Sequence, residues 1–178
     1  MREPITADNL RAFMKALAAA VTTPSRIYLV GGATSVLLGW RTSTIDIDLK
    51  IIPESDEILR SLPELKERLH LNIELASPGD FIPELPGWQE RSRFIQQEGK
   101  LAFYHYDFYA QALAKIQRGH RIDLQDVEHL ITSGLVEVKR LLELFSAIEE
   151  HLYLHPSLDG PSFRRDVERV IRESENDG

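Results

Sequence analysis

Residues 27–52, IYLVGGATSVLLGWRTSTIDIDLKII, constrain the fold more than any other part of this chain. Residues 27–30 are all apolar, with the β-branched and aromatic content of a buried strand. Gly31 and Gly32 then interrupt the strand, and because neither carries a Cβ the backbone can turn sharply and approach its surroundings closely. The segment therefore predicts a strand, a glycine turn, a short helix over residues 33–39, a loop and a second strand.

The second strand, expected over residues 44–52, alternates strictly between apolar and polar side chains. One face should carry Ile45, Ile47, Leu49 and Ile51, and the other Thr44, Asp46, Asp48 and Lys50. Cβ atoms two residues apart on a strand are about 6.5–7 Å apart, so the two aspartates can converge on one or two divalent cations. A solvated strand face and an ordinary glycine turn remain the alternative for this pattern.

The glycine pair, the thirteen residues that follow it and Asp46-Ile47-Asp48 resemble the signature of polymerase-β-type nucleotidyltransferases. The pattern is most similar to the bacterial branch that includes AbiEii-type toxin nucleotidyltransferases and related uncharacterised domains. The resemblance implies an α/β (α+β) nucleotidyltransferase fold, with a mixed central sheet flanked by helices and a helical C-terminal region. One departure is Gly32, where a serine would add a phosphate-binding hydroxyl.

A third carboxylate is expected within residues 70–76, which alternate again. Leu71, Ile73 and Leu75 should share one face, and His70, Asn72 and Glu74 the other. The resemblance implies that Ile73-Glu74-Leu75 carries the acidic residue of an adjacent strand. Asp46, Asp48 and Glu74 would then be the catalytic and metal-binding carboxylates for Mg²⁺ or Mn²⁺, whereas an exposed strand glutamate is the alternative for Glu74.

The glycine turn is the expected site for the phosphates of a nucleotide. Gly31 and Gly32 would offer backbone N–H groups at the start of a helix, and Thr34 and Ser35 could add hydroxyl donors. Neither a Walker A sequence nor a dinucleotide-binding G-x-G-x-x-G is present, and serine hydrolase and zinc hydrolase motifs are also missing.

From Asp107 the pattern becomes helical, which predicts a nucleotidyltransferase core over 1–106 and a helical region over 107–178 packed on it as one compact unit. In the toxin-type branch a helix with a lysine precedes a basic turn and an aspartate. The resemblance thus implies that Lys115 contacts nucleotide phosphates and that Asp123 or Asp126 braces the site. The alternative makes Asp123 a helix N-cap with Asp126 at N3.

Composition narrows the remaining possibilities. The 178 residues include no cysteine, which excludes disulfides, thiolate catalysis and cysteine zinc sites. A net charge of −7 argues against a surface that binds nucleic acid throughout. Apolar runs are far shorter than the roughly 18 residues that span a membrane, and no signal peptide is recognisable, so a cytoplasmic protein without a membrane partner is expected.

Three functions follow from these patterns. The first is a metal-dependent enzyme that moves a nucleoside monophosphate from a nucleoside triphosphate to a hydroxyl of an RNA end or a protein, as the toxin of a toxin–antitoxin pair with a cognate antitoxin. The second is a catalytically weak or inactive binding module of the same fold, acting as an antitoxin or nucleotide sensor. The third is a structural α/β domain, which requires Glu74 to lie far from the aspartates.

Overall fold

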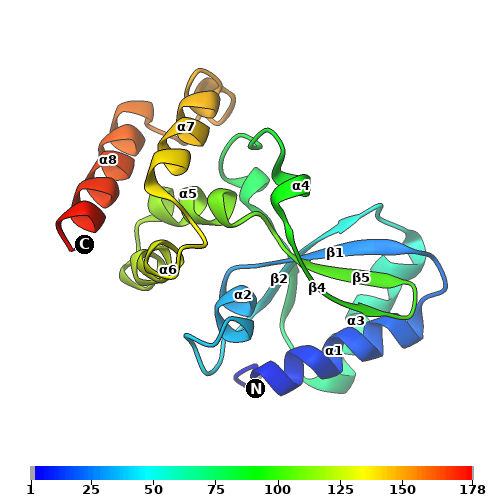
Figure 1. The fold of residues 1–178 in the computed structure, drawn as a ribbon. Helices are drawn as coiled ribbons and strands as arrows, with labels where there is room; N and C mark the ends of the chain where they lie inside the picture. The colour runs from blue at the N-terminus through cyan, green and yellow to red at the C-terminus, as the bar shows by residue number, and fades with distance from the viewer. Residues whose placement is uncertain (1–2, 178) are drawn as a thin grey trace. The chain divides into compact units, whose positions relative to one another are not determined.

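A computed structural model describes residues 3–177, and the chain divides into two compact units (Figure 1). The sheet unit contains the residues up to Ser77 together with Ser92–Tyr106. The helical unit contains Pro78–Arg91 together with the residues from Asp107 onward. The segment Pro78–Arg91, which the sequence analysis placed within 1–106, is thus grouped with the helical unit.

The sheet unit is built on five strands in the order β3-β2-β1-β5-β4. Their bounds are Ser25–Val30 (β1), Ile47–Ile52 (β2), Ile73–Leu75 (β3), Arg93–Glu98 (β4) and Leu101–His105 (β5). β1 is antiparallel to β2 and parallel to β5, β2 is parallel to β3, and β4 and β5 form an antiparallel hairpin. The sheet is therefore mixed, as the resemblance implied.

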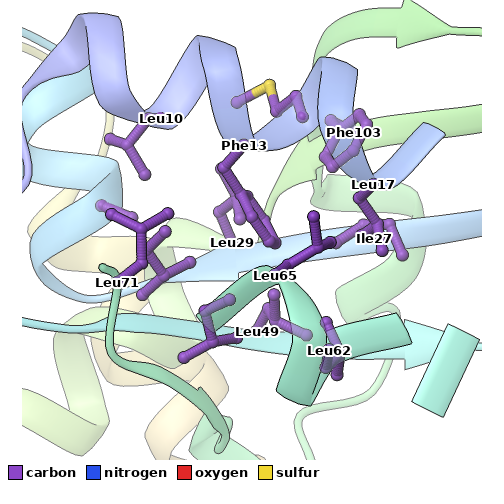
Figure 2. Close-up of a cluster of buried hydrophobic side chains, with 14 of the residues drawn as sticks. Leu10, Phe13, Leu17, Ile27, Leu29, Leu49, Leu62, Leu65, Leu71 and Phe103 are labelled. Atoms are coloured by element: carbon purple, nitrogen blue, oxygen red, sulfur yellow. The ribbon is translucent and has the colours of Figure 1, made fainter. Parts of the chain in front are cut away.

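Two amphipathic helices of the sheet unit, α1 (Ala7–Ala20) and α3 (Asp56–Leu69), pack their apolar side chains against one face of the sheet. Thr6 caps α1 in a capping box with Asn9, and Ser55 caps α3. Figure 2 shows the resulting core, in which side chains of both helices meet those of β1, β2 and β5: Leu10, Phe13, Leu17, Ile27, Leu29, Leu49, Leu62, Leu65 and Phe103. Leu71, from the loop before β3, joins them. The predicted helix after the glycine turn is α2 (Gly32–Leu37).

Two strands are shorter than the alternation predicted. β2 begins at Ile47 rather than Thr44, because Thr44 forms an isolated antiparallel bridge with Ile5 just before α1. Ile45 consequently lies outside the ladder and is 74% exposed, so its predicted place on the buried face is wrong. β3 contains only three residues, and Leu75 is half exposed where it leaves the sheet.

The helical unit is built of helices, as the sequence pattern from Asp107 onward predicted. Its elements are Pro78–Asp80 (η1), Trp88–Arg91 (α4), Phe108–Arg118 (α5), Arg121–Thr132 (α6), Val138–Glu149 (α7), Leu152–Leu154 (η2) and Gly160–Asn176 (α8). Phe145 of α7 and Phe163 of α8 pack edge to face with ring centroids 4.9 Å apart. α8 is the longest of these helices, and it continues to Asn176, one residue before the end of the described chain. Over residues 3–177, no helix has the length and apolar character needed to cross a membrane.

A buried histidine joins β5 to α2. His105 is 5% exposed, and its Nδ1 lies 3.0 Å from Oγ1 of Thr34. The Thr34 hydroxyl donates to the Leu29 carbonyl at 3.3 Å, so an imidazole protonated at Nδ1 completes the chain of hydrogen bonds. Burial, with a smaller effect of the nearby Arg93 charge, lowers the pKa of His105 to about 4.

The low pKa of His105 makes stability depend on pH. The unfolded chain takes up a proton near pH 6.5 and the folded chain only near pH 4, so the stabilisation by neutral His105 is complete above 6.5 and lost as pH falls to 4. The loss should reach about 3 kcal/mol of unfolding free energy. Urea unfolding of the parent and of His105→Gln at pH 7 and pH 4.5 measures it. An equal acid sensitivity of both proteins would contradict this assignment.

Candidate active site

The glycine turn lies directly against Asp48. Gly31, the first residue after β1, adopts φ +67°, a left-handed conformation that favours glycine. A Cβ at this position would lie 3.4 Å from Oδ2 of Asp48. The absence of a side chain at Gly31 therefore lets the backbone of the turn lie directly against the Asp48 carboxylate.

Gly32 is a glycine for a steric reason that the sequence did not reveal. A Cβ built on Gly32 would lie 2.0 Å from Oγ1 of Thr44 and 2.7 Å from its Cβ. Real atoms do not approach so closely, so any larger residue, including serine, would require Thr44 to move. Thr44 thus accounts for the departure of this chain from a Gly-Ser pair, and its hydroxyl lies beside the turn.

The strand registers bring Asp48 and Glu74 together. In β1 and β2, Asp48 lies opposite Val30, next to the glycine turn, and in β2 and β3 it lies opposite Glu74. Both carboxylates point away from the face whose residues Leu49 and Ile73 are buried under the helices. Asp48 is partly buried and Glu74 is exposed. The two side chains therefore share one face, as the alternation predicted.

Asp46 reaches the same corner of the sheet by a different route. It lies one residue before β2, so the prediction that it is part of this strand is wrong. An amide holds it in place instead. Nδ2 of Asn72 donates a hydrogen bond to Oδ1 of Asp46. The same atom donates to Oε1 of Glu74 at 3.3 Å. Asn72 was placed by its alternation on the face of Glu74, but no motif assigned it a function.

The donor atoms of this corner suit a hard divalent cation. Carboxylate oxygens are the ligands that Mg²⁺ and Mn²⁺ prefer, and Asp48 and Glu74 present them side by side. Within the described part of the chain, however, no three acidic or histidine side chains close around a single point. Between Asp46 and Glu74 the shared neighbour is the Asn72 amide. The carboxylates thus suit a divalent cation in the type of their donor atoms and in their location beside the glycine turn. The Asn72 amide, however, lies between Asp46 and Glu74.

The two hydroxyls predicted to bind phosphate are directed to the protein backbone. Thr34 and Ser35 are almost completely buried. The Thr34 hydroxyl donates to the Leu29 carbonyl at 3.3 Å, and the Ser35 hydroxyl to the Gly31 carbonyl at 3.4 Å. Both side chains therefore shape the glycine turn, and a contact with phosphate would require these hydrogen bonds to break.

The remaining predicted residues belong to the helical unit, where they form a buried ion-pair cluster between α5 and α6. Nζ of Lys115 lies 2.8 Å from Oδ2 of Asp126 and 3.8 Å from Oδ1 of Asp123. Arg118 donates twice to Asp123, at 2.6 and 2.7 Å. Both aspartates are buried, and the N-cap of α6 is His120, so a capping role for Asp123 is wrong.

The charges of this cluster are matched. Burial alone would raise the pKa of Asp123, but the hydrogen bonds and charge of Arg118, with the charge of Lys115, outweigh it and hold that pKa below its usual value. The two buried aspartates therefore depend on Lys115 and Arg118 to offset the cost of burying their charges. Lys115 accordingly has a structural role within the helical unit, in addition to the nucleotide contact that the resemblance implies.

Lys115→Ala should destabilise the protein. The substitution leaves the buried Asp126 without its cation, and breaking a buried ion pair costs about 3 kcal/mol. Thermal unfolding should show a clearly lower Tm for Lys115→Ala, whereas the exposed Lys139→Ala control should match the parent. A parent-like Tm for Lys115→Ala would mean that the pair carries no net stability.

Comparisons with known proteins agree with this architecture. The sequence model of a family described as nucleotidyltransferase of unknown function (DUF6036) matches residues 8–172. Among solved structures, an antigenic nucleotidyltransferase-like protein from Paracoccidioides brasiliensis is similar in fold, with a TM-score of 0.51 and 14% identity. The match covers 96% of this chain and 95% of the other. A comparison with curated proteins finds no match.

Proposed function

Because the chain belongs to this family of nucleotidyltransferases of unknown function, we propose that it transfers a nucleoside monophosphate from a nucleoside triphosphate to a hydroxyl acceptor. One observation carries the proposal. Asp48 lies in register with Glu74 on one side, and its carboxylate faces the turn at Gly31 on the other. Acidic side chains beside an open backbone turn suit a triphosphate bound together with cations.

In this reaction the acceptor oxygen forms a bond to the α-phosphorus, the bond from that phosphorus to the bridging oxygen breaks, and pyrophosphate leaves. Mg²⁺ or Mn²⁺ held by Asp46, Asp48 and Glu74 would neutralise phosphate charge and favour release of the acceptor proton to solvent water. Glu74 is the exposed member of the Asp48–Glu74 pair, so it lies on the side from which an acceptor hydroxyl can approach. Gly31 lets the triphosphate approach the backbone beside Asp48.

The identity of the acceptor follows only from the sequence pattern. The similarity of the glycine pair and Asp46-Ile47-Asp48 to AbiEii-type toxins supports an RNA end or a protein as acceptor, and a cognate antitoxin as partner. In the proposal Lys115, with Asp123 and Asp126, serves the nucleotide. That role requires Lys115 to exchange its contact with Asp126 for a phosphate oxygen.

A second function is favoured by one feature, the Asn72 amide that separates Asp46 from Glu74. If this arrangement persists with nucleotide present, the chain binds nucleotide without turnover and acts as a sensor or antitoxin. The two functions differ in a simple observable, because only the enzyme releases pyrophosphate when an acceptor is supplied.

Asp48→Asn should abolish the metal-dependent part of nucleotide binding. It removes the one carboxylate that adjoins both Gly31 and Glu74, while an amide of the same shape preserves packing. Calorimetry with each of the four nucleoside triphosphates and Mn²⁺ should show binding for the parent and at least about tenfold weaker binding, or about 1.4 kcal/mol, for the variant.

The control for this experiment is Asp8→Asn, an exposed aspartate of the same unit at the start of α1. It should bind nucleotide like the parent, and all three proteins should melt at similar temperatures. Absence of binding by the parent to any of the four nucleotides at millimolar concentration would refute the proposed function.

A further inference from the structure

We propose that Asn72 is a positioning residue of this site, whose amide occupies the place of a cation between Asp46 and Glu74 and must release at least one of them when a cation binds. The inference rests on the proposed function. It assigns a specific regulation to the site: cation binding competes with a neutral hydrogen-bond donor that the protein itself supplies.

The backbone fixes Asn72 between the two acids. Its carbonyl accepts a hydrogen bond from the Ile47 amide at 2.8 Å, which joins the residue before β3 to the first residue of β2. Asp46 directly precedes Ile47, and Glu74 follows Asn72 by two residues on the same side of the chain. A side chain at position 72 therefore projects between these carboxylates whenever the two strands pair.

The chemistry of the amide matches this position. An asparagine NH₂ group has two hydrogens, one for each carboxylate, whereas its oxygen would repel both. Nδ2 contacts Oδ1 of Asp46 and Oε1 of Glu74, so the two negative groups share one donor atom. The amide satisfies their oxygens but carries no net charge, and the electrostatic repulsion between the acids therefore remains.

A divalent cation would satisfy the same oxygens and also remove the repulsion. It cannot share the space between them with the NH₂ group, because the amide hydrogens point at the oxygens that the cation needs. Asn72 thus stabilises the site without metal and weakens the affinity for metal. A purely structural asparagine would contribute the same stability under both conditions.

Two variants separate these possibilities, each melted in chelator and in Mn²⁺. Asn72→Ala removes the shared donor, and Asn72→Asp replaces it with a third acid of the same shape. Both should melt below the parent in chelator, and Asn72→Asp lowest. Both should show a larger Mn²⁺-induced rise in Tm than the parent, with a Mn²⁺ dissociation constant at least about tenfold lower, as expected for the loss of a competing hydrogen bond to a charged group.

Two controls make the result specific. Asn176→Ala removes an asparagine at the end of α8 and should behave like the parent in both conditions. Adding Glu74→Gln to Asn72→Ala should reduce the loss of Tm seen in chelator, because one of the two repelling charges is then absent. A loss that is unchanged by Glu74→Gln would contradict repulsion between the acids.

The outcomes distinguish this inference from the proposed function. An equal, non-zero Mn²⁺ shift in the parent and in Asn72→Ala overturns the competition and leaves the proposed metal site standing. A shift in the variants alone supports the inference, since Asn72 then occludes the site in the parent. No shift in any of the proteins removes the metal site of the proposed function, and the inference falls with it.

Discussion

The register of β2 is the constraint on which the candidate site depends. Side chains alternate along a strand, so a slip of one residue would turn Asp48 into the apolar core and Leu49 out to solvent. Leu49 and Ile47 are completely buried under the helices, and burying each such side chain stabilises the fold by about 1.5–3 kcal/mol. Burial of the apolar side chains on one face of the sheet therefore keeps two acidic residues, Asp48 and Glu74, side by side on the opposite face.

Three sets of contacts shape the glycine turn beside Asp48. Gly31 brings the end of β1 against its carboxylate without a side chain, and Thr44 fills the space beside Gly32. The hydrogen bond between His105 and Thr34 connects α2, which follows the turn, to β5. The turn is thus held by contacts within the sheet unit itself.

The sequence predicted the parts of the site that depend on local alternation. The shared face of Asp48 and Glu74 follows from period-two patterns in two short segments, and the glycine turn from its composition. The position of Asp46 could not be predicted, because Thr44 pairs with Ile5, far away in the sequence, and β2 begins only at Ile47. The contacts of Asn72 were also not predictable, since they depend on how two strands pair rather than on a motif.

For the charged residues between α5 and α6, the sequence motif implies a role in nucleotide binding, whereas the packing gives them a structural role. The resemblance implies that Lys115 is a phosphate ligand, yet its charge lies within 4 Å of two buried aspartates, Asp123 and Asp126. Paired charges of this kind are costly to separate, because each partner has already lost its hydration. A lysine that both stabilises a helix pair and serves a nucleotide would link nucleotide binding to the stability of that unit.

The central claim, that the corner formed by Asp46, Asp48 and Glu74 binds a cation with a triphosphate, is tested most directly by crystallography. Crystals grown with Mn²⁺ and a non-hydrolysable nucleoside triphosphate should show an anomalous Mn²⁺ peak bonded to Asp48 and Glu74, with the triphosphate beside Gly31. A bound nucleotide elsewhere in the protein, with no Mn²⁺ at these carboxylates, would contradict the account.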